Sequence, residues 1–311
     1  MKSFTNLFRF STKIARLKEY KYPSLNQNVK DNVIWFHGMY DSSKNFFNIA
    51  QNQQLRNISN QILLDCRNHG LSEHTETHTF KEMAYDAVEY IANRDMKDLY
   101  LIGHSMGGRT ILGALQEHQA FLLDRVKGVI IIDVLPSVYA VDSPAIQQMS
   151  RYLQEMKSIS IVDKSFEQLE KEVKGNFSDA IAANILSNID VLQTGQLRWC
   201  INFSALEKSF ESLISFEVRD CLWKGPRKVM IGKKSKFTSM ESVAKTYPSV
   251  FVDFDINKDV IEFQNSGHFL YLFEQEKFIN EVVSFIQQVD SESNSFQKQK
   301  EKFLDQVVFD I

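Results

Sequence analysis

The sequence has few of the residues that stabilise disulfide-rich domains, and it has no segment suited to crossing a membrane. Its 311 residues include 3 cysteines and 5 prolines. Three cysteines without the spacing of metal ligands argue against a disulfide scaffold and favour a reducing compartment. No apolar run approaches the roughly 20 residues that a transmembrane helix requires. We therefore expect a chain with no transmembrane segment and with buried, unpaired cysteines.

An excess of charge of one sign is missing as well. The chain carries 36 lysines and arginines against 39 aspartates and glutamates, a formal net charge of -3 at pH 7. This balance gives no broad basic surface for nucleic acid or for an anionic membrane, and we expect no nucleic-acid partner. With 43% hydrophobic residues, the chain can bury the core of one large domain with an insertion, or of two domains at most.

The first 20 residues differ from the rest in composition. Lysine and arginine recur there, and no acidic residue occurs before Glu19. Phe4, Leu7 and Phe8 share one helical face beside several serines and threonines. This profile is typical of a mitochondrial import segment. We expect a targeting segment over residues 1–20 and a mitochondrial location, in the matrix or at the inner membrane; the alternative is an ordinary basic amphipathic helix on a cytoplasmic protein.

Beyond residue 30, short apolar runs alternate with amphipathic helical segments. Runs of this kind are typical of strands buried on both faces of a parallel sheet. Apolar stripes at helical spacing cover residues 80–91 and 278–286. The alternation predicts a doubly wound α/β fold with a mostly parallel sheet. The expected strands are Val33–Phe36, Ile62–Leu64, Leu99–Ile102, Val129–Ile132, Val229–Ile231 and Val260–Phe263.

One long stretch of the chain lacks this alternation of strand-like and helix-like segments. Residues 137–222 contain several helix-like stretches and no convincing buried strand. A segment of this length between two core strands indicates an inserted helical cap. We therefore expect an α/β core over residues 30–136 and 223–288, a cap over 137–222, and a C-terminal extension over 289–311.

The most informative motif reads Gly-His-Ser-Met-Gly at positions 103–107. An apolar run precedes it, and Ile111, Leu112 and Leu115 follow at helical spacing. The Gly-x-Ser-x-Gly spacing suits a strand that turns sharply into a helix, because only small flanking residues avoid a backbone clash there. Such a turn presents the serine hydroxyl outward. The motif in this context predicts that Ser105 is a nucleophile.

A serine nucleophile needs a base, and the best-placed histidine is His268. Serine is inert at its free pKa, so a neutral imidazole must accept its proton. His268 lies in a loop after the last apolar run, near the end of the final expected strand. In an open α/β sheet the site lies at that edge. The order of serine before histidine along the chain also matches this type of site.

The base in turn needs a carboxylate that orients it. The usual place is the turn after Val229–Ile231, but that turn reads Gly-Lys-Lys-Ser-Lys and has no acidic residue. Asp133 ends the strand before it and would reach the same sheet edge. We expect Asp133 to be the acid, with Asp253 and Asp255 as alternatives.

The oxyanion formed in the reaction needs two N–H donors. One is expected from the backbone of Met106, directly after the nucleophile and at the positive end of a helix. The second is expected from Met39, within the tight turn His-Gly-Met-Tyr at 37–40. This chemistry requires neither an organic cofactor nor a metal ion.

These motifs together resemble the α/β-hydrolase superfamily. The resemblance rests on five segments in the order of that family: Trp-Phe-His-Gly at 35–38, Asp-Cys-Arg-Asn-His-Gly-Leu-Ser at 65–72, the motif at 103–107, Ile-Asp-Val at 132–134 and Ser-Gly-His at 266–268. With Arg-Trp-Cys-Ile-Asn-Phe at 198–203, the chain is similar to a branch of bacterial esterases and mitochondrial eukaryotic members. The resemblance spans about residues 30–288. It implies a serine esterase or lipase-type acyl hydrolase with a helical cap, and it also places the acid at Asp133.

The leading hypothesis is hydrolysis of an ester or thioester of a small or lipophilic acyl group through an acyl-Ser105 intermediate. A competing hypothesis is a non-catalytic hydrolase-fold subunit or scaffold of a mitochondrial assembly. It rests on residues 291–295, expected to be a polar linker, and on the apolar residues 303–304 and 307–309 beyond it, which suit docking of a protein partner as a short amphipathic helix. Cleavage of a carbon–carbon bond on the same site is a third option. Dehalogenase chemistry is disfavoured, since its nucleophile would be a carboxylate at position 105.

Overall fold

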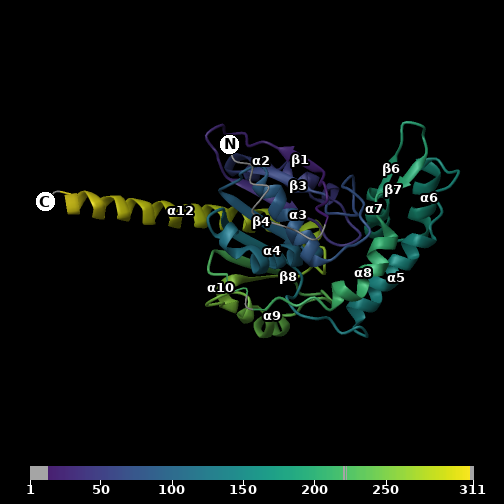
Figure 1. Ribbon diagram of the computed structural model, residues 1–311. Coiled ribbons are helices and arrows are strands. Elements are labelled where there is room, and N and C mark those ends of the chain that lie inside the picture. The colour runs from purple at the N-terminus through teal and green to yellow at the C-terminus, as the bar shows by residue number, and fades with distance from the viewer. Residues whose placement is uncertain (1–12, 220, 222, 309–311) are drawn as a thin grey trace.

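The core of the protein is a seven-stranded sheet with the order β1-β3-β2-β4-β5-β8-β9 (Figure 1). The computed structural model describes residues 13–219, 221 and 223–308, and the side chains of these except residues 180 and 294–308. All neighbouring strands in the sheet are parallel except β1, which pairs antiparallel with β3. The sheet strands are β1 (Glu19–Tyr22), β2 (Asn32–Phe36), β3 (Asn60–Leu64), β4 (Leu99–His104), β5 (Val126–Ile132), β8 (Arg227–Gly232) and β9 (Val260–Phe263).

Helices cover both faces of the sheet, as the alternation of patterns along the sequence predicts. The helices of the core and of the region between β5 and β8 are η2 (Ser43–Phe46), α1 (Phe47–Ala50), α2 (Gln53–Ile58), α3 (Phe80–Ala92), α4 (Met106–Leu123), α5 (Pro144–Ser158), α6 (Phe166–Asn176), α7 (Asp179–Ser187), α8 (Phe203–Ile214), α9 (Met240–Thr246), η3 (Tyr247–Ser249), α10 (Ile256–Asp259), α11 (Leu270–Phe273) and α12 (Gln275–Val308). The predicted fold class, a mostly parallel doubly wound sheet, is confirmed.

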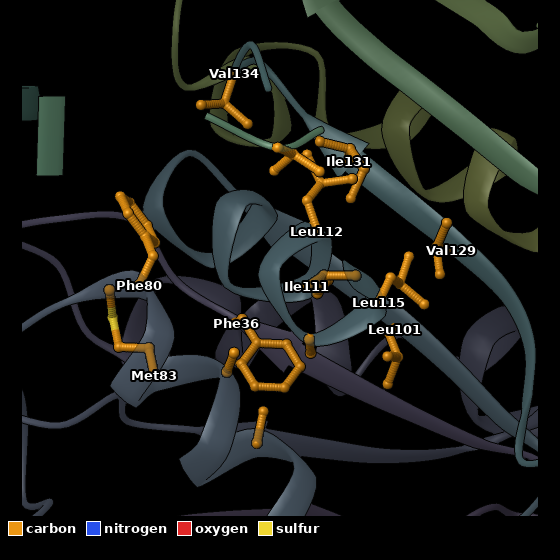
Figure 2. Close-up of a cluster of buried hydrophobic side chains, with 14 of the residues drawn as sticks. Phe36, Phe80, Met83, Leu101, Ile111, Leu112, Leu115, Val129, Ile131 and Val134 are labelled. Carbon is orange, nitrogen blue, oxygen red and sulfur yellow. The ribbon is translucent and has the colours of Figure 1, made fainter. Parts of the chain in front are cut away.

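Alternate residues of each central strand enter two separate cores. In β2, Ile34 and Phe36 face one core, whereas Val33 and Trp35 face the other. The first core is formed with α3 and α4, and Figure 2 shows Ile111, Leu112 and Leu115 of α4 among the side chains of the strands. The second is formed with η2, α1, α2, α11 and the first half of α12. Because side chains alternate along a strand, a continuous apolar run fills both cores at once.

The region between β5 and β8 forms a separate layer on one side of the sheet (Figure 1). It contains α5, α6, α7 and α8 and the antiparallel hairpin of β6 (Ile189–Val191) and β7 (Leu197–Trp199). The sequence indicated only helices here, and the hairpin is an addition to that expectation. Its strands have three residues each, and Ile189 is their one buried residue, so they give no buried apolar run in the sequence. The four helices share a core of their own, which Tyr40 also enters from the loop after β2.

The N-terminal strand β1 was not expected from the sequence, and it begins within the first 20 residues. The strand lies at the edge of the sheet, and none of its four residues is fully buried. Its sequence therefore contains no apolar run. Before it, the backbone N–H of Ala15 donates to Asp86 Oδ1 at 2.8 Å, and Ala15 is buried. Residues 13–22 are therefore packed into the fold. The import segment expected over residues 1–20 stays a prediction, and its residues 1–12 lie outside the described residues.

The C-terminal extension continues the last core helix without a break. α12 runs from Gln275 to Val308 and projects from the body on the side away from the inserted layer (Figure 1). The polar residues 291–295, expected as a linker, are helical. The predicted partner-docking residues 303–304 and 307–309 lie outside the described side chains. Among the described residues, no helix combines the length and apolar character that crossing a membrane requires.

The three cysteines are buried as free thiols, as their number and spacing indicate. Burial raises the pKa of Cys200 to about 11 and that of Cys221 to about 12. Thiols with raised pKa values are poor nucleophiles, since the thiolate is the reactive form. The cysteines therefore serve as small packing residues.

A substitution at Gly107 tests how strictly the first core constrains the start of α4. A Cβ atom there would lie 2.2 Å from the carbonyl oxygen of Phe36 in β2, and neither backbone can move without breaking the sheet. We expect Gly107→Ala to lower the free energy of unfolding by about 3 kcal/mol or more. Gly175→Ala in α6 is the matched control, because no atom lies within 4 Å of its added Cβ, and it should stabilise by up to about 1 kcal/mol. Denaturant unfolding measures both, and equal effects would contradict this packing account.

Candidate active site

Ser105 lies on the sharp turn between β4 and α4, where the sequence motif predicts it. Its φ of 51° and ψ of -114° are unusual for a residue with a side chain. The backbone N–H of Ser105 donates to the carbonyl oxygen of Ile132 at 2.8 Å, which holds the turn to the end of β5. Strain of this kind persists only where the surrounding structure supports it, and it is found most often at functional sites.

Asp133 follows β5 and is fully buried, with four hydrogen-bond donors around its carboxylate. Oδ1 accepts from the backbone N–H of Gly232 at 3.0 Å and from the hydroxyl of Thr238 at 2.5 Å. Oδ2 accepts from the hydroxyl of Ser235 at 2.5 Å and from the ring of His268. The turn after β8, which has no acidic residue, thus supplies the donors that hold the acid from the preceding strand.

His268 is the residue that Asp133 meets. Its Nδ1 lies 2.7 Å from Asp133 Oδ2. Because a carboxylate accepts hydrogen bonds, the proton of the neutral ring is on Nδ1, and Nε2 is the basic nitrogen. The structure therefore brings together two of the three predicted catalytic side chains, Asp133 and His268, with the tautomer that a general base requires.

Two neighbours fix the plane of the His268 ring. The ring of Phe237 stacks on it, with centroids 4.1 Å apart and an interplanar angle of 27°. On another side lies the buried ring of His104, at a centroid distance of 4.5 Å, and its Nε2–H donates to the backbone carbonyl of His268 at 2.9 Å. The hydrogen bond of His104 to the His268 loop and the stacking of Phe237 are visible only in the structure.

Met39 and Met106 lie beside Ser105 and line the same narrow cavity, which has a volume of about 30 Å³. Other lining residues are mostly apolar and come from the core and from the inserted layer: Phe80, Val134, Ile146, Met149, Leu213 and Phe237. Met106 is the first residue of α4, so its N–H is free of the helical hydrogen-bond pattern. Both predicted oxyanion residues are therefore next to the predicted nucleophile.

The direction of the Met39 N–H follows from its neighbour His37. Nε2 of His37 accepts from the backbone N–H of Cys66 at 2.9 Å, so Nδ1 carries the proton and donates to the carbonyl oxygen of Gly38 at 2.8 Å. In a planar trans peptide the C=O and N–H point in opposite directions. His37 thus directs the Gly38 carbonyl toward itself and the Met39 N–H away from itself. Burial lowers the pKa of His37 to about 4, which keeps the ring neutral.

The alternative acids, Asp253 and Asp255, have other roles. The backbone carbonyl of Asp253 accepts from Arg227 Nη2 at 2.8 Å. The side chain of Asp255 caps α10 by accepting from the N–H of Asn257 at 2.9 Å. Neither provides a contact to His268 in the described part of the chain, where the ring's hydrogen bond goes to Asp133.

Arg109 is a site residue that the sequence reasoning missed. It lines the cavity one helical turn after Ser105 and is buried. Its guanidinium donates to three backbone carbonyls, those of Leu135, Ser137 and Leu213. These carbonyls belong to the segment that enters the inserted layer and to the helix α8 at its far end. Arg109 therefore ties the nucleophile's helix to both ends of the insertion, and a basic residue four positions after the serine was the only signal for it.

Comparisons with known proteins agree with this geometry. The family model described as alpha/beta hydrolase fold matches residues 31–275. The chain belongs to the alpha/beta hydrolase family. As expected of that family, the strained serine turn, the late histidine and the carboxylate lie at one edge of the parallel sheet. Among the described residues of this hydrolase, no group of three histidine, cysteine, aspartate or glutamate side chains is arranged to hold a metal ion.

Several relatives of this hydrolase carry names that indicate ester chemistry. It is 26% identical over 264 residues to the sn-1-specific diacylglycerol lipase ABHD11 of Danio rerio. The alignment covers 82% of this chain and 78% of the relative. It is 24% identical to a probable alcohol acetyltransferase of Cyberlindnera fabianii, over 84% of this chain and 73% of the relative. A solved structure, a marine microorganism esterase, superposes with a TM-score of 0.76 at 26% identity, covering 87% of this chain and 99% of that one. These likenesses support ester hydrolase activity in general.

Proposed function

We propose that this chain hydrolyses an ester or thioester of a small or lipophilic acyl group through an acyl-Ser105 intermediate. The observation that carries the proposal is the 2.7 Å contact between His268 Nδ1 and Asp133 Oδ2 beside the strained serine turn. A buried carboxylate that fixes the tautomer of a histidine near a serine elbow is the arrangement that activates a hydroxyl nucleophile.

The reaction proceeds in two halves. His268 Nε2 takes the proton of Ser105 as the hydroxyl oxygen attacks the acyl carbon, and His268 then gives this proton to the departing alcohol or thiol. In the second half His268 takes a proton from water, the resulting hydroxide attacks the acyl-Ser105 ester, and the proton returns to Ser105. Asp133 orients the ring and stabilises the imidazolium. The approach of Ser105 to His268 is expected to tighten when substrate binds.

Backbone N–H groups of Met39 and Met106 would stabilise the oxyanion of each tetrahedral intermediate. The position of both residues at the cavity beside Ser105 supports this role, and so does the direction that His37 imposes on the Gly38 carbonyl. Each such donor is typically worth about 3 kcal/mol in the transition state. The helix α4 adds the positive end of its dipole at the same place.

The cavity favours an apolar acyl group. Its lining is mostly apolar and includes Met149 and Leu213 of the inserted layer. Its one charged lining residue, Arg109, donates to three backbone carbonyls. The names of two relatives, a diacylglycerol lipase and a probable alcohol acetyltransferase, also point to acyl substrates.

The first prediction concerns the nucleophile. Ser105→Ala removes the attacking oxygen, and we expect the hydrolysis of p-nitrophenyl acetate and butyrate to fall by more than about a thousandfold. Labelling by a fluorophosphonate probe should disappear. Ser187→Ala is the matched control, because this hydroxyl donates to a helix carbonyl far from the cavity. Unchanged hydrolysis or labelling of Ser105→Ala would overturn the proposed mechanism.

A second prediction separates Asp133 from the alternative acids. Asp133→Asn keeps the shape of the side chain but no longer imposes the Nδ1–H tautomer on His268. We expect kcat to fall by roughly four orders of magnitude, the size associated with the loss of a triad carboxylate. Asp253→Asn, whose backbone carbonyl makes its contact with Arg227, should retain activity. If kcat in the same ester assay falls in Asp253→Asn and is retained in Asp133→Asn, the acid is Asp253 instead.

The competing function is a non-catalytic hydrolase-fold subunit or scaffold of a mitochondrial assembly, docked to its partner through the C-terminal extension. The observation that favours it is the projection of α12 from the body (Figure 1). Import through residues 1–20 is part of that proposal. The full chain should then show no ester hydrolysis, and deleting residues 291–311 should reduce the mass of the native complex. An unchanged native mass would remove the support for a partner at this helix.

A further inference from the structure

Tyr40, directly after the oxyanion residue Met39, has an unusual backbone that needs support from other segments. Its φ is 58° and it is buried. For an aromatic residue this left-handed conformation is unfavourable. The turn therefore persists because groups elsewhere in the fold hold its peptide units.

His69 holds the peptide between Met39 and Tyr40. The backbone N–H of Tyr40 donates to His69 Nε2 at 3.3 Å. On the other side of the ring, Nδ1 lies 2.9 Å from the carbonyl oxygen of Arg67. Because that oxygen only accepts, Nδ1 carries the proton, and Nε2 is left as the acceptor that the Tyr40 N–H requires.

The ring of His69 is fixed in place by other buried rings. It meets His37 edge-on with centroids 5.1 Å apart and His78 at 5.2 Å, and its side chain is fully buried. Burial lowers the pKa of His69 to about 3. The ring therefore stays neutral, and Nε2 stays an acceptor, across the pH range in which esterases are assayed.

The opposite side of Tyr40 is held from the inserted layer. Nδ2 of Asn188, the residue after α7, donates to the carbonyl oxygen of Tyr40 at 2.9 Å. The two peptide units that flank Tyr40 are thus anchored to different parts of the fold. On the Met39 side, His69 supplies the anchor.

We propose that His69 is a positioning residue that, together with His37, holds Met39 as the second oxyanion donor: His37 fixes the peptide before Met39, and His69 fixes the peptide after it. With the Tyr40 N–H directed to His69, the Met39 carbonyl points the opposite way, because the peptide is planar and trans. Without that acceptor a buried N–H is unpaired, and rotation of the peptide to find another partner displaces Met39 as well. The inference rests on the proposed function, since it concerns the oxyanion of that reaction.

Two substitutions distinguish the roles of the two ring nitrogens of His69. In His69→Gln the amide oxygen reaches the position of Nε2 and accepts from Tyr40. In His69→Asn the shorter amide replaces only Nδ1 and donates to Arg67. We expect kcat for p-nitrophenyl butyrate to fall at least about tenfold in the Asn variant, less than the roughly hundredfold or greater loss of a whole oxyanion donor. KM should stay nearly constant in both, and the Gln variant should recover most of kcat.

His74→Asn is the matched control, because His74 lies five residues further along the chain but is exposed and bonds to the backbone of Cys200. It should hydrolyse the ester at the wild-type rate. Thermal unfolding of all variants shows whether each is folded, and binding of a trifluoromethyl ketone analogue reports the oxyanion site directly. Equal kcat in the folded Asn and Gln variants, or a loss confined to KM, would overturn the role of His69. Absence of hydrolysis by the wild type would instead overturn the proposed function.

Discussion

The buried carboxylate of Asp133 imposes the strongest constraint on the site. A charge that is removed from water must be surrounded by donors, or its burial is costly. Here the donors are Gly232, Ser235, Thr238 and His268. They come from the turn after β8 and from the loop after β9, so one carboxylate fixes the relative positions of three strand ends. The orientation of His268 depends on this arrangement, as does the proposed chemistry at Ser105.

The other side of the site depends on buried imidazoles that remain neutral. His37 and His69 each use one nitrogen as donor and the other as acceptor. Through these bonds the turn after β3 holds the loop after β2, which contains Met39. The Asp-Cys-Arg-Asn-His-Gly-Leu-Ser segment at 65–72 therefore organises the neighbouring loop. Arg109 holds the inserted layer in a similar way, because the backbone carbonyls to which it donates lie at both ends of that layer.

Elements that bury a continuous apolar run were predictable, and those without one were not. All six strands expected from the sequence are present in the sheet. β1 and the hairpin of β6 and β7 were missed because edge and surface strands bury little on either face. Likewise, the serines and the other polar residues at 291–295 suggested a linker, yet the backbone there is helical. Polar composition alone does not distinguish a solvated helix from a loop.

The sequence by itself determined the strand, turn and helix around Ser105, because the spacing of two glycines and the flanking apolar residues act over a few positions of the chain. It also pointed to His268 and Asp133 through their places at the ends of strands. Only the tertiary structure decided what these residues touch: the ring of Phe237 on His268, the donors from the lysine-rich turn on Asp133, and His69 on Tyr40. These contacts join residues from 29 to 102 positions apart in the chain. No local pattern encodes them, since they depend on how the whole sheet and its loops pack together.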